Sequence, residues 1–209
     1  MLWLPTSSAE ERERALRVAT EHLLHEQIVI IPTDTVYGVA ALPGSNAAIA
    51  RLFAAKGRDP MKSLPLLVAD VGLAWPLGEA VRPEARRLGE RFWPGGLTLV
   101  VQAAAVFPSG IAAPDGSIGL RIPAHDLTRS LLRACGGVLA VTSANLSGKP
   151  SPRTANEASA IAPAVAALID TGRVGGQDST VVDVRGDQPV LLRAGAVPWE
   201  VILHTWRHS

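Results

Sequence analysis

Short apolar runs alternate with amphipathic segments along most of this chain. Ile28–Ile31 and Val138–Val141 are unbroken apolar runs of strand length, and a polar segment follows each of them. Such runs are typical of strands that are buried on both faces of a sheet. The segment Ser8–Gln27 instead repeats apolar residues at helical spacing, which predicts an amphipathic helix. The pattern therefore indicates buried strands covered by helices.

Helix starts can be recognised from the residues that cap them. Ser8 and Glu11 form a capping-box pattern, as do Thr154 and Glu157. Pro83 suits the first turn of a helix, because its missing N–H is not needed there. The predicted helices cover residues 8–27, 46–56, 83–91 and 126–132, with another from Ala155. The expected caps are Ser45 or Asn46 for the second helix and Asp126 for the fourth.

Eight apolar segments have the length and composition of strands. They are Ile28–Ile31, Leu64–Val68, Leu97–Val101, Ile118–Ile122, Val138–Val141, Leu168–Asp170, Val181–Val184 and Val190–Leu192. Their alternation with helices predicts an α/β fold built on a mixed sheet. The 209 residues contain no internal repeat and are most simply one domain, 1–209.

The loop 32–38 follows the first predicted strand and is rich in short polar side chains. Thr33 and Thr35 supply hydroxyls, Asp34 supplies a carboxylate, and Tyr37 is the only tyrosine of the chain. In open α/β sheets ligands bind where strands end, so these side chains are candidates for ligand contacts. The alternative is a hydroxyl or Asx turn in which they cap only their own backbone.

A second polar loop follows the predicted strand 138–141. Ser143 and Asn145 are alternate residues, so in an extended chain they face the same side. Both can form hydrogen bonds to phosphate or nucleotide, or give an oxygen ligand to Mg²⁺. The alternative is an ordinary loop with turn chemistry over 145–148.

Cations are concentrated at the end of the predicted helix 46–56. Lys56, Arg58 and Lys62 lie within seven residues, and only Asp59 opposes them. A polyphosphate needs convergent cations of this kind, because Arg grips two oxygens at once and Lys supplies a point charge. The alternative is a basic loop that faces solvent.

Arg121 lies at the end of the predicted strand 118–122. A guanidinium at a strand end can clamp a carboxylate. The alternative is an ion pair with a nearby acid such as Asp115 or Asp126. His125, just before a predicted helix, is expected to cap or pack that helix rather than to act as an acid or base.

Composition narrows the class of protein. Hydrophobic residues make up 47% of the chain and charged residues 19%, which is typical of a globular protein. A formal net charge of +1 gives no electrostatic sign of nucleic-acid binding. Cys135 is the only cysteine, so an internal disulfide and a Cys-rich zinc site are excluded, and we expect it in the core. Prolines and glycines interrupt the uncharged segment 92–114, so we do not expect it to span a membrane. No signal peptide opens the chain, so we expect a cytoplasmic protein.

Several motifs stand in one order along the chain. They are Pro32–Gly38, Lys56–Arg58 with Lys62, Trp93–Thr98, Arg121–His125, Thr142–Gly148, Ser151–Pro152, Asp178–Asp183 and Leu192–Gly195. In this order they resemble the YrdC-like family of threonylcarbamoyl-AMP synthases, and the resemblance extends from about Val29 to Val197. It implies the family's fold, a strongly twisted mixed β-sheet wrapped by helices around a concave pocket.

The resemblance also implies roles for individual residues. The positions that match L-threonine contacts are Thr33, Thr35, Arg121 and Ser179. The positions that match ATP contacts are Lys56, Arg58, Lys62, Ser143, Asn145, Ser151 and Arg193, and the implied catalytic set is Lys56, Arg58, Ser143 and Asn145. Asp59 departs from the family pattern, because Pro is expected there and here follows one place later, at Pro60.

The implied reaction converts L-threonine, bicarbonate and ATP into threonylcarbamoyl-AMP and pyrophosphate. An N-carboxylated threonine would attack the α-phosphorus of ATP, and Mg²⁺ would be held mainly by the phosphates. The product serves the N6-threonylcarbamoyladenosine modification of adenosine 37 in certain tRNAs, so tRNA and downstream threonylcarbamoyl-transferase proteins are the expected partners. Such chemistry depends on positioning and charge neutralisation, which fits candidates rich in cations, hydroxyls and amides.

Two other functions stay open from the sequence. The first is a double-stranded RNA or tRNA-binding module without ATP turnover, and the near-neutral charge counts against it. The second is a carbamoyl-adenylate-forming domain of the hydrogenase-maturation type, which shares this fold but carries Cys-rich zinc segments. The chain also has no phosphate-loop motif and no Gly-x-Gly-x-x-Gly motif, so ATP would have to be bound by side chains from several loops.

Overall fold

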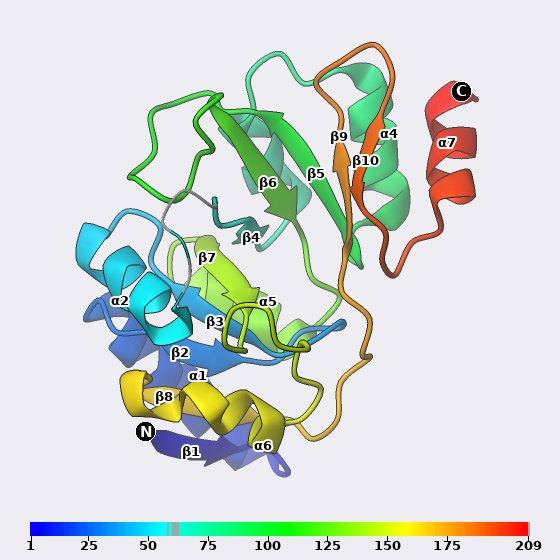
Figure 1. Ribbon diagram of the computed structural model, residues 1–209. Coiled ribbons are helices and arrows are strands. Elements are labelled where there is room, and N and C mark those ends of the chain that lie inside the picture. Colours follow the sequence, from blue (N-terminus) through cyan, green and yellow to red (C-terminus); the bar gives the residue numbers. More distant parts are fainter. Residues whose placement is uncertain (58, 60–62, 209) are drawn as a thin grey trace.

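The computed structural model describes residues 1–57, 59 and 63–208 (Figure 1). Ten strands of these residues form one sheet, in the spatial order β1-β8-β2-β3-β7-β4-β6-β5-β9-β10. Their bounds are β1 Leu2–Pro5, β2 Val29–Ile31, β3 Gly38–Ala41, β4 Leu66–Val68, β5 Leu97–Gln102, β6 Ser117–Arg121, β7 Val138–Ser143, β8 Ala167–Asp170, β9 Thr180–Asp183 and β10 Val190–Arg193. β1, β8 and β2 run parallel, whereas β3 and β7 are antiparallel to their neighbours. The predicted mixed sheet is therefore confirmed.

The helices are α1 Ala9–Leu24, α2 Asn46–Lys56, α3 Val71–Ala74, α4 Pro83–Phe92, α5 Asp126–Ala134, α6 Ala155–Ala158 and α7 Trp199–Arg207, with the 3₁₀ helices η1 Trp75–Leu77 and η2 Ser159–Ala164. The capping box at Ser8 is confirmed, because its hydroxyl accepts from the Glu11 amide while Glu11 accepts from the Ser8 amide. Ser45 is the cap of α2, and its hydroxyl accepts from the Ala48 amide at 3.1 Å.

The expected cap of α5 was wrong. His125 is the N-cap, and its Nδ1 accepts from the backbone N–H of Thr128 at 3.4 Å. Asp126 is instead the first residue of the helix. His125 has an extended backbone, which lets its ring reach back over the first turn as a short polar side chain would. The expectation that His125 caps or packs this helix is confirmed.

The predicted capping box before α6 is only half formed. The Thr154 hydroxyl accepts from the Glu157 amide at 3.2 Å, but the Glu157 carboxylate accepts from the Arg153 amide and not from that of Thr154. The helix is correspondingly short. After Ala158 the chain tightens into η2, which contains Pro163.

Helices cover both faces of the sheet. On one face, α1 and α5 pack against the strands through a buried cluster that includes Leu23, Leu131 and Ile169. On the other, α2, α4, η2 and α7 pack through a larger cluster that includes Leu88 and Trp206. Figure 1 shows α4 and α7 side by side near the C-terminus. Among the described residues, no helix is long and apolar enough to cross a lipid bilayer.

Strand register brings the polar loops together. Gly38, which opens β3, pairs with Ser143 at the end of β7, so the two polar loops lie side by side. Leu67 of β4 pairs with Arg121 at the end of β6. A Cβ atom on Gly38 would lie 2.6 Å from Cγ1 of Val141, so a residue without a side chain is required where β3 meets β7.

Candidate active site

One cavity lies across the neighbouring strands from β3 to β10. It has a volume of about 170 Å³, and each of these strands contributes a lining residue from within it or directly beside it. The lining residues are Thr33, Thr35, Val36, Gly38, Pro65, Leu67, Thr98, Arg121, Val141, Thr142, Ser143, Asp178, Ser179 and Arg193. The four predicted threonine contacts are all among them. A volume below about 300 Å³ suits an amino acid better than a drug-sized ligand.

The loop 32–38 forms one wall of this cavity. The Thr33 hydroxyl accepts from the amides of Thr35 and Val36, both at 3.1 Å, and donates to the Val36 carbonyl at 2.6 Å. The hydroxyl turn considered as an alternative is therefore present at Thr33. Its second effect is to fix Thr35, whose hydroxyl lies 3.0 Å from that of Thr33 and is buried in the same wall.

Arg121 connects this wall to the end of β6. Its guanidinium donates to the Asp34 carboxylate at 2.6 Å, to the Thr35 hydroxyl at 2.9 Å and to the Gly95 carbonyl at 2.9 Å. These bonds use three of its five N–H groups, which leaves two for a ligand. Arg121 is only 6% exposed. Burial lowers its pKa, and the charge of Asp34 opposes that shift.

The local ion pairs considered for Arg121 were wrong. Asp115 pairs with Arg185 at 2.9 Å, and the acid that pairs with Arg121 is Asp34, from the loop after β2. Asp34 also accepts from the Ala124 amide at 3.0 Å. Because the two partners are 87 residues apart in sequence, local spacing could not identify this pair.

Ser179 and Arg193 form the opposite wall. Arg193 donates to the Ser179 carbonyl at 2.9 Å and to its hydroxyl at 3.0 Å. The Ser179 hydroxyl also lies 2.8 Å from that of Thr98, a buried residue at the start of β5 that ends the motif Trp93–Thr98 and to which the sequence assigned no role. A second hollow of about 360 Å³ continues from this wall and shares Pro65, Thr98, Ser179 and Arg193 with the first.

Lys56, Ser143 and Asn145 form a third cluster beside the cavity. Lys56 is only 2% exposed, and its ammonium donates to the Ser143 carbonyl and to the Asn145 carbonyl and side-chain oxygen, the last two at 2.7 and 3.1 Å. The Ser143 hydroxyl donates to the Asn145 side-chain oxygen at 2.5 Å. Lys56 therefore shapes the loop that presents Ser143 to the cavity. Arg58 and Lys62, predicted to act beside it, lie outside the described residues.

A second carboxylate, Asp178, faces the cavity. The Ser151 hydroxyl donates to both of its oxygens, at 3.0 and 3.1 Å. Asp178 is the first residue of the motif Asp178–Asp183 and directly precedes Ser179, and this position could have identified it from the sequence. Among the described residues, no three His, Cys, Asp or Glu side chains gather in a way that would hold a metal ion. Cys135 is buried, as expected for a core residue, and burial raises its pKa to about 11.

The geometry can now be set beside known proteins. The family model for Sua5, YciO and YrdC proteins, described as "Telomere recombination", matches residues 21–195. The chain belongs to this family.

Its relatives include named synthases. A threonylcarbamoyl-AMP synthase of Pyrococcus abyssi is 36% identical over 91% of this chain and 56% of that protein. Its Bacillus subtilis counterpart is 35% identical over 94% of this chain and 58% of that protein. The crystal structure of P. abyssi Sua5 complexed with L-threonine superimposes with a TM-score of 0.89 and 33% identity, over 98% of this chain and 60% of that one. The chain thus spans less than two thirds of the length of these relatives. The superposition confirms the fold that the family resemblance implied.

Proposed function

We propose that the protein is an L-threonylcarbamoyladenylate synthase, which converts L-threonine, bicarbonate and ATP into threonylcarbamoyl-AMP and pyrophosphate. The observation that carries this proposal is the single cavity that brings Thr33, Thr35, Arg121 and Ser179 together from three separate segments. The relatives named as synthases, and the relative solved with L-threonine, support the assignment.

In this proposal the cavity holds threonine by its charged ends. The two remaining N–H groups of Arg121 bind the carboxylate, beside the Thr35 hydroxyl that Arg121 orients. The Asp178 carboxylate, which accepts from the Ser151 hydroxyl and lines the cavity, accepts from the ammonium group. Ser179 and Thr98 then bond to the hydroxyl of the substrate. Each charged group of threonine meets an opposite charge, and its hydroxyl meets a hydroxyl.

ATP lies in the adjoining hollow and against the loop that follows β7. Arg193 lies where the two hollows meet, and Ser143 with Asn145 is held in place by Lys56. Arg58, Lys62 and Ser151 complete the proposed ATP contacts. Mg²⁺ arrives with ATP and is held by phosphate oxygens, with Ser143 and Asn145 as the available protein oxygens.

The proposed chemistry needs positioning more than a protein nucleophile. The threonine amine takes up carbon dioxide or bicarbonate as an N-carboxylate, which attacks the α-phosphorus of ATP and displaces pyrophosphate. Arg58, Ser143 and Asn145 hold the phosphates and the attacking group in line, Lys56 fixes the loop that carries Ser143 and Asn145, and charge neutralisation lowers the barrier. The product would pass to a threonylcarbamoyl-transferase that modifies adenosine 37 of tRNA, in the cytoplasm.

The direct test is to incubate the protein with ATP, Mg²⁺, bicarbonate and isotopically labelled threonine, and to identify the product by mass. We expect a labelled adenylate and stoichiometric pyrophosphate, both of which require bicarbonate. The matched control is Arg185→Lys, because Arg185 forms exposed ion pairs outside the cavity. Pyrophosphate release that does not depend on threonine would contradict the proposal.

A further inference from the structure

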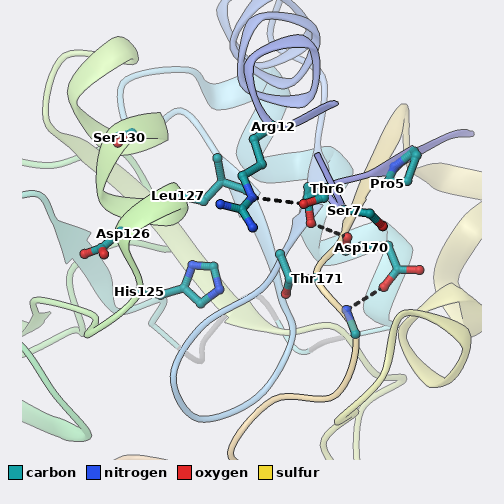
Figure 2. A pocket seen from close by; sticks show the side chains of 11 residues that line it. Pro5, Thr6, Ser7, Arg12, His125, Asp126, Leu127, Ser130, Asp170 and Thr171 are labelled. Carbon is teal, nitrogen blue, oxygen red and sulfur yellow. Dashed lines mark hydrogen bonds between the residues drawn. The ribbon is translucent and has the colours of Figure 1, made fainter. Parts of the chain in front are cut away.

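A larger cavity lies elsewhere in the molecule and has no role in the proposed reaction (Figure 2). Its volume is about 840 Å³, within the range of pockets that hold small organic ligands. It is lined by Pro5, Thr6, Ser7, Arg12, His125, Asp126, Leu127, Ser130, Asp170, Thr171 and Gly172, none of which lines the candidate active site.

The topology places this cavity where α/β proteins bind ligands. β1 and β8 are parallel neighbours, and the cavity lies beyond their carboxyl ends, at Pro5 and Asp170. Crevices outside the carboxyl ends of parallel strands are the general ligand site of open α/β sheets. The first turn of α5 forms the facing wall.

The floor of the cavity is fixed before any ligand arrives. The Tyr37 hydroxyl donates to the Gly172 carbonyl at 2.6 Å and accepts from the Thr171 amide at 3.1 Å, and Tyr37 itself is fully buried. A preformed floor reduces the entropy that a ligand must lose through ordering the protein.

Arg12 points into this cavity from α1 (Figure 2). Its Nε donates to the Thr6 carbonyl at 3.0 Å, which fixes the direction of the guanidinium. Among the described residues no carboxylate forms an ion pair with Arg12, and its two terminal nitrogens have no hydrogen-bond partner. Arg12 therefore presents the planar N–H edge that grips two oxygens of an anion.

His125 adds a second ring nitrogen to the cavity. Its Nδ1 accepts the Thr128 amide at 3.4 Å as the cap of α5 and lies 3.2 Å from the Thr128 hydroxyl, and in the tautomer that forms this cap the proton of the neutral ring is on Nε2. Figure 2 shows the ring directed toward Arg12 and Thr171. Nε2 has no partner among the described residues, so this N–H is available to a ligand.

Two carboxylates, Asp126 and Asp170, also line the cavity and keep their negative charge, so an anion has to bind away from them. Asp170 accepts from the Gly172 amide at 2.8 Å and from Nε1 of Trp3 at 3.0 Å, so each of its oxygens already has a partner. The Asp126 side chain points away from Arg12 in Figure 2. The centre of the cavity is therefore rich in donors, with the hydroxyls of Ser7, Ser130 and Thr171 around it.

We propose that this cavity binds the phosphate group of a small molecule, through the terminal N–H groups of Arg12 and the Nε2–H of His125. The planar edge of Arg12 fits two phosphate oxygens, and His125 and the hydroxyls bond to the remaining ones. Since 840 Å³ exceeds what a single phosphate needs, the remaining space would hold the body of a phosphorylated metabolite.

The test is a titration of the isotopically labelled full chain with inorganic phosphate and, separately, with adenosine monophosphate. The signals to follow are the Thr171 and Gly172 amides and the His125 ring nitrogens in NMR spectra. We expect saturable shifts at these signals, tighter for the nucleotide than for the free ion. Equal affinity for both would identify free phosphate as the ligand and would still support the site.

Variants make the test specific to this cavity. Arg12→Gln should weaken phosphate binding at least tenfold, and Arg17→Gln, another exposed position on α1, should leave it unchanged. His125→Asp keeps a cap acceptor for α5 but replaces the donor with a negative charge, so it should abolish binding. Shifts that never saturate, or that Arg12→Gln leaves unchanged, would overturn the proposal. If His125→Asp fails to fold, the comparison of Arg12→Gln with Arg17→Gln still decides the test.

Discussion

Arg121 is the residue whose geometry most constrains the candidate site. It is bonded at once to the loop 32–38, to Gly95 and, in the proposed function, to the carboxylate of the substrate. Lys cannot reproduce this planar set of donors. Arg121→Lys should therefore weaken threonine binding at least tenfold and leave ATP affinity closer to normal, measured by separate calorimetric titrations. If ATP affinity collapses while threonine binding persists, Arg121 serves the phosphates instead.

The ion pair between Arg121 and Asp34 can also be tested by changing Asp34. Asp34→Asn would leave Arg121, a nearly buried cation, without its ion pair. Breaking a buried pair in this way costs about 3–5 kcal/mol, and we expect the free energy of unfolding to fall by about that amount. Urea denaturation measures the loss.

The matched control for Asp34→Asn is Asp115→Asn. The Asp115 side chain is 54% exposed and pairs with Arg185 at 2.9 Å. An exposed pair contributes about 0–1 kcal/mol, so this variant should be nearly as stable as the wild type. Similar losses in the two variants would show that burial of the Arg121 pair has little energetic weight.

At the scale of elements, the end of α2 and the end of β7 act together. Lys56 closes α2, and its ammonium bonds to the loop after β7, which carries Ser143 and Asn145. Lys56→Met keeps most of the side-chain length but leaves those oxygens without a buried donor. We expect threonine-dependent pyrophosphate release to fall at least tenfold, with faster amide exchange over residues 143–149. Lost activity with unchanged exchange would show that Lys56 binds the phosphates directly.

The sequence predicted elements best where a single segment contains the whole signal. The capping box at Ser8 and the apolar run after Gln27 are local, and both predictions were confirmed. β3 was missed because three of its four residues are Gly or Ala, which have little strand preference, and only its pairing between β2 and β7 makes it a strand. β1 was missed for a different reason, since it is only four residues long and lies at the edge of the sheet.

At the scale of the whole molecule, the candidate site depends on the strand order. Motifs far apart in sequence meet because β3, β7, β4, β6, β5, β9 and β10 are consecutive neighbours in the sheet. The motifs identified Thr35, Arg121 and Ser179 as candidates, but the contacts of Arg121 with Asp34 and of Ser179 with Thr98 became visible only once the strands were paired. Residue type and order could therefore be predicted from sequence, whereas contacts between distant segments required the fold.

A site assembled from so many strands should couple ligand binding to global stability. A ligand that binds only the folded state adds about 2.7 kcal/mol of stability at a concentration of one hundred times Kd. For a chain of this size each kcal/mol raises Tm by about 2–4 °C, so saturating L-threonine should raise Tm by about 5–10 °C.

Valine lacks the hydroxyl that Ser179 and Thr98 are positioned to bond, and should leave Tm nearly unchanged because those buried groups would be left unpaired. Serine, which differs from threonine by one methyl group, should give an intermediate shift. Thermal unfolding with each amino acid measures the effect, and Arg121→Lys should remove the threonine shift. An equal shift with valine would place the specificity of the site outside the pair Ser179 and Thr98.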